Sequence, residues 1–177
     1  MKTLKKITFV MCMLVAFSAF SQTKKDKKIM SDANDAKEAL IKADPGLTKY
    51  FENAAGYALF PNVGKGGFII GGASGNGVVY ENGVAVGMAD LKKLDIGLQA
   101  GGQAIIQVIF FETDVDLARF KEGNFKFSAE ATAVAVEKGV AVSTSYNDGV
   151  ATFALPKAGL MASASVGGQK FSYNAFY

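Results

Sequence analysis

Two stretches near the start of the chain carry apolar residues at helical spacing. The first stripe recurs every three or four positions: Ile29, Ala33, Ala36, Leu40 and Ala43. Such a stripe is typical of an amphipathic helix that packs on a core. Asp44-Pro45 then predicts a second short helix, because Asp caps a helix and Pro suits its first position. Its stripe holds Leu47, Tyr50, Phe51 and Ala54, and Gly56 ends it.

The pattern changes to strands and glycine from Tyr57 onward. Short apolar or alternating segments lie between turn residues, which is typical of a β-rich body. The predicted strands cover residues 57–60, 67–72, 78–81, 84–88, 104–111, 125–135, 140–146, 150–155, 160–166 and 171–177. Asn82-Gly83 and Asn147-Asp148-Gly149 predict two hairpin turns.

Two segments in the middle of the chain have distinct patterns. Residues 104–111 are almost continuously apolar, and this short run suits a strand buried on both faces. Residues 114–120 suit a short helix capped by Thr113 or Asp114. The whole pattern predicts an α+β fold, with a strongly curved antiparallel β-sheet or barrel-like body and two or three short flanking helices. Only Gly46 precedes Gly56 among the 20 glycines, and glycine permits the bends that a closing sheet requires.

The first 21 residues have the pattern of a secretory signal peptide. Lys2, Lys5 and Lys6 precede an apolar run over residues 7–17, and small residues at 19 and 21 favour cleavage after Ser21. The run is too short to favour a membrane-spanning helix, which needs about 20 residues. We expect a periplasmic or secreted protein with a flexible Lys-rich leader over residues 22–30 and a single domain over residues 31–177.

The composition excludes several classes of function once the signal is removed. The chain has 19 basic and 16 acidic residues, and the signal holds three of the former and none of the latter. A charge-balanced mature chain lacks the basic surface that nucleic-acid binding requires. The chain has no His, and its one Cys, Cys12, lies in the signal, which excludes thiolate zinc sites and Ser-His-Asp catalysis. We expect no enzymatic activity, no cofactor and no metal site.

The candidate binding residues are lysines in three places. The leader carries four of them: Lys24, Lys25, Lys27 and Lys28. They suit an electrostatic tether to an anionic membrane, at about 1 kcal/mol per Lys. They equally suit a soluble leader that aids export, and the sequence favours neither.

The other candidate lysines lie in the domain. Lys65, in Gly64-Lys65-Gly66-Gly67, would add an ammonium to backbone N–H groups that face a phosphate head group. A tight turn is favoured there, because glycine first serves backbone geometry. Lys92 and Lys93 would contact anionic lipid, but Asp90 and Asp95 beside them favour a solvated loop.

Asp114 and Asp116 form the one pair of carboxylates that suggests chemistry. A general acid–base pair needs a cleft and shifted pKa values. Acids are favoured in the first turn of a helix without any such requirement, so a capping role is favoured. A calcium site that also uses Glu112 lacks the remaining ligands of an EF-hand loop.

Six blocks of the chain, rich in glycine and apolar residues, occur in a specific order. The blocks are Tyr57-Ala-Leu-Phe-Pro-Asn-Val-Gly-Lys-Gly-Gly-Phe68, Gly71-Gly72, Gly75-Asn-Gly77-Val-Val79, Ile96-Gly-Leu-Gln-Ala-Gly-Gly-Gln103, residues 125–130 and residues 159–168. Together they resemble the SYLF domain, a family also called the lipid-binding or yeast actin-binding domain. The likeness covers about residues 33–175. It implies a non-enzymatic module that binds phospholipid or another lipid at a membrane surface.

Three functions from different classes fit the sequence to different degrees. The leading hypothesis is an exported, peripheral lipid- or membrane-surface-binding module. The first alternative is a small outer-membrane β-barrel, which the signal, the alternating strands and terminal Phe176-Tyr177 favour. A hydrolase ranks last, because no nucleophile is paired with a base.

Overall fold

The structure is a computed structural model of the chain. It describes residues 23–64, 73–93, 104–123, 125, 127, 132–157, 163–166 and 168–176. The helices are α2 (Lys24–Ala43), α3 (Leu47–Asn53), α4 (Asp114–Lys121) and α5 (Val140–Ser143). The strands are β1 (Gly56–Gly64), β2 (Ala73–Glu81), β3 (Val84–Lys93), β4 (Ile105–Phe111), β5 (Thr132–Ala135), β6 (Val150–Pro156), β7 (Ser163–Ser165) and β8 (Gln169–Ala175). Several predictions lie outside the described residues: the signal, the strand at 67–72, residues 126 and 128–131 of the strand at 125–135, and residues 160–162 of the strand at 160–166.

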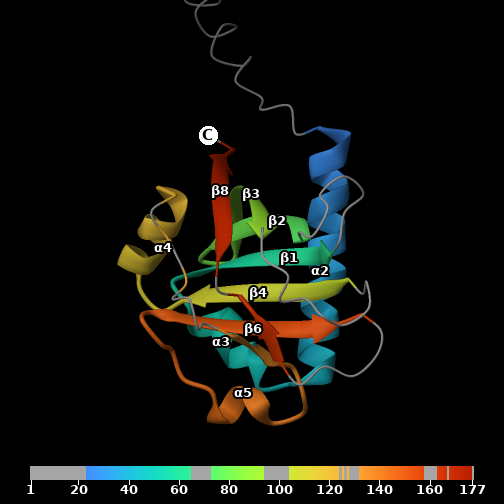
Figure 1. The fold of residues 1–177 in the computed structure, drawn as a ribbon, viewed down its shortest axis with the longest axis vertical. Helices are drawn as coiled ribbons and strands as arrows, with labels where there is room; N and C mark the ends of the chain where they lie inside the picture. Colours follow the sequence, from blue (N-terminus) through green and yellow to red (C-terminus); the bar gives the residue numbers. More distant parts are fainter. Residues whose placement is uncertain are drawn as a thin grey trace, which may run out of the picture.

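The described strands form one open sheet in the order β7-β5-β6-β4-β1-β2-β3-β8 (Figure 1). Every pairing is antiparallel except that of β5 with β6. Helices α2 and α3 pack against the sheet through apolar side chains from each. This arrangement confirms the predicted α+β class and its mostly antiparallel sheet.

The two predicted turns are present, each with residues in the left-handed region. Asn82 and Gly83 have φ values of 51° and 78° and join β2 to β3. Asp148 and Gly149 have φ values of 50° and 76°. This second turn closes only a single bridge, between Asn147 and Val150, and joins no pair of long strands.

The prediction of a strand over residues 140–146 is wrong, because Val140–Ser143 forms helix α5. Gly139, with φ of 87°, turns the chain into this helix. The carboxylate of Asp44 then accepts a hydrogen bond of 2.7 Å from the Ala141 N–H and one of 3.0 Å from the Gly46 N–H. Burial raises the pKa of Asp44, but the backbone donors of residues 46 and 139–141 outweigh it and leave the pKa below its usual value. A short Val-Ala-Val run suits a strand or a helix, and a distant carboxylate decides between them.

Helix α2 begins earlier than its apolar stripe indicates. Thr23 caps it: the Thr23 hydroxyl accepts from the Asp26 N–H at 3.1 Å, and the Asp26 carboxylate accepts from the Thr23 N–H at 2.9 Å. Reciprocal bonds of this kind satisfy two helix-end donors. The leader predicted over residues 22–30 is therefore helical from Lys24 onward.

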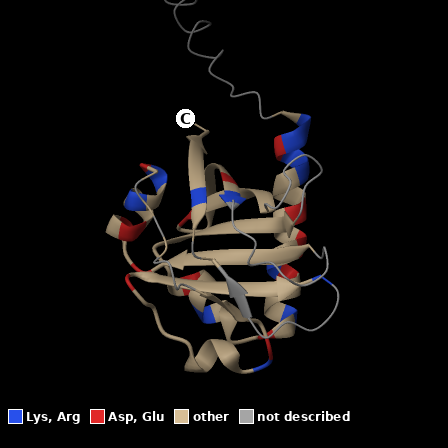
Figure 2. Ribbon diagram, in the orientation of Figure 1, with Lys and Arg blue, Asp and Glu red and all other residues tan. Residues whose placement is uncertain are grey.

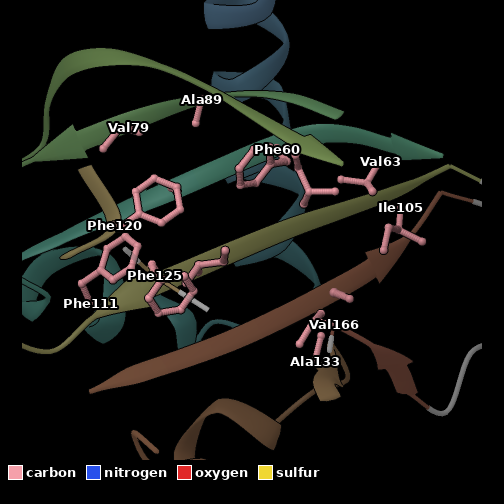
Figure 3. Close-up of a cluster of buried hydrophobic side chains, with 14 of the residues drawn as sticks. Phe60, Val63, Val79, Ala89, Ile105, Phe111, Phe120, Phe125, Ala133 and Val166 are labelled. Atoms are coloured by element: carbon pink, nitrogen blue, oxygen red, sulfur yellow. The ribbon is translucent and has the colours of Figure 1, made fainter. Parts of the chain in front are cut away.

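Strand β4 is buried at all seven positions, which confirms the prediction for residues 104–111. Its Ile106, Val108 and Phe110 belong to the apolar cluster under helices α2 and α3. Its Ile105, Ile109 and Phe111 belong to a second cluster on the opposite face. Figure 3 shows Phe111, Phe120 and Phe125 grouped in this second cluster. The sheet therefore separates two cores.

A pair of buried carboxamides lies on the second face of the sheet. Gln107 on β4 and Gln169 on β8 exchange two hydrogen bonds, of 2.9 Å and 3.0 Å. Both side chains are buried, and each carboxamide supplies a hydrogen-bond donor and an acceptor to the other. Without this exchange, burial would leave these polar atoms without a partner. Three strands, β1, β2 and β3, separate β4 from β8 in the sheet order.

Candidate functional site

A groove of about 320 Å³ lies between the first two turns of α2 and strands β2, β3 and β8. The N-terminal end of α2 and the C-terminal end of β8 lie at the same end of the molecule (Figure 1). Helix α2 contributes Lys25, Asp26 and Ile29 to the groove. The strands contribute the rest of its lining: Asn76, Met88, Ala89, Asp90, Asn174, Ala175 and the adjoining Phe176.

The packing of α2 explains why the groove exists. The helix is fully buried against the sheet only at Ala33, Ala36 and Leu40, which all lie in its middle and C-terminal part. The residues before Ala33 are exposed or half-buried. The first turns of α2 therefore leave space between themselves and the sheet.

The register of the strands places the groove's sheet residues in two rows. Met88 lies opposite Asn174, and Asp90 lies opposite both Asn76 and Ser172. Residues 88 and 90 share one face of β3, because strand side chains alternate. Gly87 lets β8 come close, since a Cβ there would lie 2.6 Å from the Asn174 carbonyl oxygen. The groove therefore has one row that contains Met88 and Asn174, beside a second row, Asn76, Asp90 and Ser172, that is wholly polar.

Asp90 is the central charged group of the polar row. It accepts hydrogen bonds from the Asn76 carboxamide and, at 3.5 Å, from the Ser172 hydroxyl. Both donors are neutral. Among the side chains that the structure describes, no Lys or Arg forms an ion pair with Asp90. Its negative charge is half-buried and has no cationic partner there.

The lysines at the start of α2 divide between two sides of the helix. Lys25 lines the groove. Lys24, Lys27 and Lys28 are exposed and lie together on another side, because residues three and four apart on a helix are neighbours. Lys28 pairs with Asp32 at 3.3 Å. Figure 2 shows these positive charges at the end of α2.

The remaining predicted lysines have different positions. Lys92 and Lys93 end strand β3, where the sequence favoured a loop. Lys92 is exposed, lies two residues beyond Asp90 and pairs across the strands with Lys170. Lys93 pairs with Gln169. Lys65 lies outside the described residues. The structure therefore brings only Lys25 to the groove and places Lys92 next to it along β3.

Most of the groove's lining carries no signal in the sequence. Asn76, Met88 and Asp90 read as ordinary residues of a β-hairpin, and Asn174 and Phe176 as part of a terminal strand. Alternation indicates which of them share a face. It does not indicate that a helix from the start of the chain lies over them.

The chain matches no protein-family model. It also matches no curated protein. The resemblance to the SYLF domain therefore stays a prediction that depends on the sequence blocks given above.

The carboxylates of α4 act as a helix cap, as the sequence favoured. The Thr113 hydroxyl and the Asp116 carboxylate form a capping box, and Arg119 pairs with Asp116. Burial raises the pKa of Asp116, but hydrogen bonds from Thr113 and Arg119 and the Arg119 charge lower it below its usual value. Asp114 is exposed in the same first turn.

None of the described helices has the length and apolar character needed to cross a membrane. In the described part of the chain, no three His, Cys, Asp or Glu side chains come together as metal ligands.

Proposed function

We propose that this protein is a non-enzymatic module that binds lipid at a membrane surface, with the α2 end of the molecule toward the membrane. The observation that carries the proposal is the meeting, at one end of the molecule, of exposed lysines and a groove lined by both apolar and polar side chains. Lys24, Lys27 and Lys28 supply the positive charge. Ile29, Met88 and Phe176 supply half-buried apolar side chains beside it.

The chemistry of these groups suits a peripheral contact. Basic side chains near an anionic surface each contribute about 1 kcal/mol. Apolar side chains add to binding when they enter the boundary between head groups and acyl chains. The capping box of Thr23 and Asp26 supports the arrangement, since it stabilises the turn of α2 that carries the lysines.

We also propose that the sheet curls into the barrel-like body that its many strands and its glycines predict. Eight strands about 4.8 Å apart would separate the two edges of a flat sheet by about 34 Å. Yet residues 166–168 alone join the edge strands β7 and β8, and four residue steps span about 14 Å at most. The bonds between Gln107 and Gln169 across three intervening strands support the same curl.

Binding to vesicles tests the proposed function. We expect the protein to float with phosphatidylcholine vesicles that contain phosphatidylglycerol, and to bind less as salt screens the charges. Replacement of Lys24, Lys27 and Lys28 by Gln should weaken binding about tenfold to hundredfold, because three favourable charges are lost. Vesicle flotation over a series of lipid concentrations measures this change.

A matched triple variant separates position from total charge. Lys42, Lys49 and Lys138 are also exposed, and they lie in α2's last turn, in α3 and just before α5, away from the groove. Their replacement by Gln changes the net charge equally and should leave vesicle binding almost unchanged. Equal losses in the two triple variants would contradict an oriented contact.

A further inference from the structure

We propose that the groove binds the zwitterionic head group of a phospholipid, with the cationic amine toward Asp90 and the phosphate toward Lys25. This inference rests on the proposed function and names the chemistry that its groove recognises. It covers phosphocholine and phosphoethanolamine, which share a phosphate joined to a cationic nitrogen. The same groups occur in free soluble molecules, so the test includes both sources.

The charges in the groove are the first argument. Three charged residues line it, Lys25, Asp26 and Asp90. Asp26 belongs to the helix cap, because its carboxylate accepts the Thr23 N–H. Among the described residues, the side-chain donors to Asp90 are Asn76 and Ser172, and both are neutral. The charged groups available to a ligand are therefore the Asp90 carboxylate on the sheet and the Lys25 ammonium on the helix. A ligand that carries one positive and one negative charge pairs with both of them.

The apolar lining around Asp90 is the second argument. Met88 precedes it on the same face of β3, and Phe176 and Ile29 contribute to the same groove. A quaternary or primary ammonium with its methylene groups suits this mixture, because aromatic rings and carboxylates both attract organic cations. A simple inorganic anion would make no contact with the apolar side chains and would add no positive charge next to Asp90.

The size and the charges of the groove disfavour two other ligands, a whole acyl chain and a strongly anionic head group. A groove of about 320 Å³ accommodates a head group, whereas a whole acyl chain would require a longer apolar channel. A strongly anionic head group would be repelled by the negative charge of Asp90, which forms no ion pair with the described side chains. Anionic lipids are therefore assigned to the exposed face of Lys24, Lys27 and Lys28, outside the groove.

Titration with phosphocholine and phosphoethanolamine tests the proposal directly. The full chain is labelled with ¹⁵N, and amide shifts are followed as each free compound is added. A second arm uses vesicles of phosphatidylcholine, without anionic lipid, to present the same group from a membrane. We expect shifts at residues of the groove, and a dissociation constant raised about tenfold by Asp90→Asn, which removes the charge and keeps an acceptor for Asn76.

Asp35→Asn is the matched control, since Asp35 is an exposed acid on α2 and does not line the groove. Weakened binding in Asp90→Asn but not in Asp35→Asn, in either arm, supports the proposal, and the responding arm identifies the source. Equal binding by both variants, or no binding of either probe, overturns it. Flotation with phosphatidylglycerol vesicles depends on the exposed lysines and persists in that case, which separates this failure from failure of the proposed function.

Discussion

Replacement of Phe110 by Ala should lower the free energy of unfolding by about 3–5 kcal/mol. Phe110 is fully buried in β4, under helix α3. Its ring centroid lies 4.9 Å from that of Phe51, 5.2 Å from that of Tyr50 and 6.0 Å from that of Phe153. Rings from α3, β1 and β6 surround the Phe110 side chain, so the cavity could not collapse without movement of at least one of these elements. Urea unfolding followed by far-UV circular dichroism measures the change.

Val142→Ala is the control for this variant. Val142 is 78% exposed on helix α5. It follows Ala141, which belongs to the same apolar cluster as Phe110. A surface change of this kind should alter stability by about 0.5 kcal/mol or less. A loss below about 1 kcal/mol for Phe110→Ala would contradict a packed core under the helices.

Replacement of Phe120 by Ala should have a comparable effect on the opposite face of the sheet, again about 3–5 kcal/mol. Phe120 extends from α4 into the second core and is fully buried. Its ring centroid lies 5.0 Å from that of Phe111, 5.2 Å from that of Phe171 and 5.8 Å from that of Phe125. The ring therefore joins α4 to strands β4 and β8. Its loss removes contacts that hold β8 against the remainder of the sheet.

Val115→Ala, on the same helix, separates packing from helix propensity. Val115 is 69% exposed, and Ala is a better helix former than Val. We expect unchanged or slightly higher stability for Val115→Ala. If Phe120→Ala behaved in the same way, the second core would not contribute to folding as described.

Local patterns were sufficient to predict several elements. The β2–β3 turn follows from Asn82-Gly83, whose positive φ values this residue pair accommodates. The cap of α4 follows from Thr113 and Asp116, three residues apart. The burial of β4 on both faces follows from its apolar composition. In each of these cases the decisive residues lie within a few positions of one another.

Errors occurred where a distant residue or an unrecognised cap decides the structure. Helix α5 depends on Asp44, whose carboxylate accepts from Ala141, 97 positions along the chain. The early start of α2 depends on the capping box of Thr23 and Asp26, which precedes the first residue of the apolar stripe, Ile29. The extension of β3 to Lys93 depends on its pairing with β8.

The candidate site could be predicted only in part. The lysines of the leader stand out as a charge cluster, so composition alone identifies them. The groove combines residues from α2, β2, β3 and the end of the chain. The groove exists because α2 begins well before Ala33, its first residue that is buried against the sheet. No short-range pattern in the sequence indicates how far the helix extends beyond the sheet.

A fluorescent probe on α2 reports directly whether this end of the molecule contacts the membrane. Ser31 is exposed on the side of α2 that holds Lys27 and Lys28, and Val142 is exposed near the other end of the fold. Each is replaced by Cys in a Cys12→Ser background and labelled with an environment-sensitive dye. With vesicles that contain phosphatidylglycerol, we expect a blue shift and brighter emission at position 31 and no change at position 142. A response at position 142 alone, or at neither position, would contradict it.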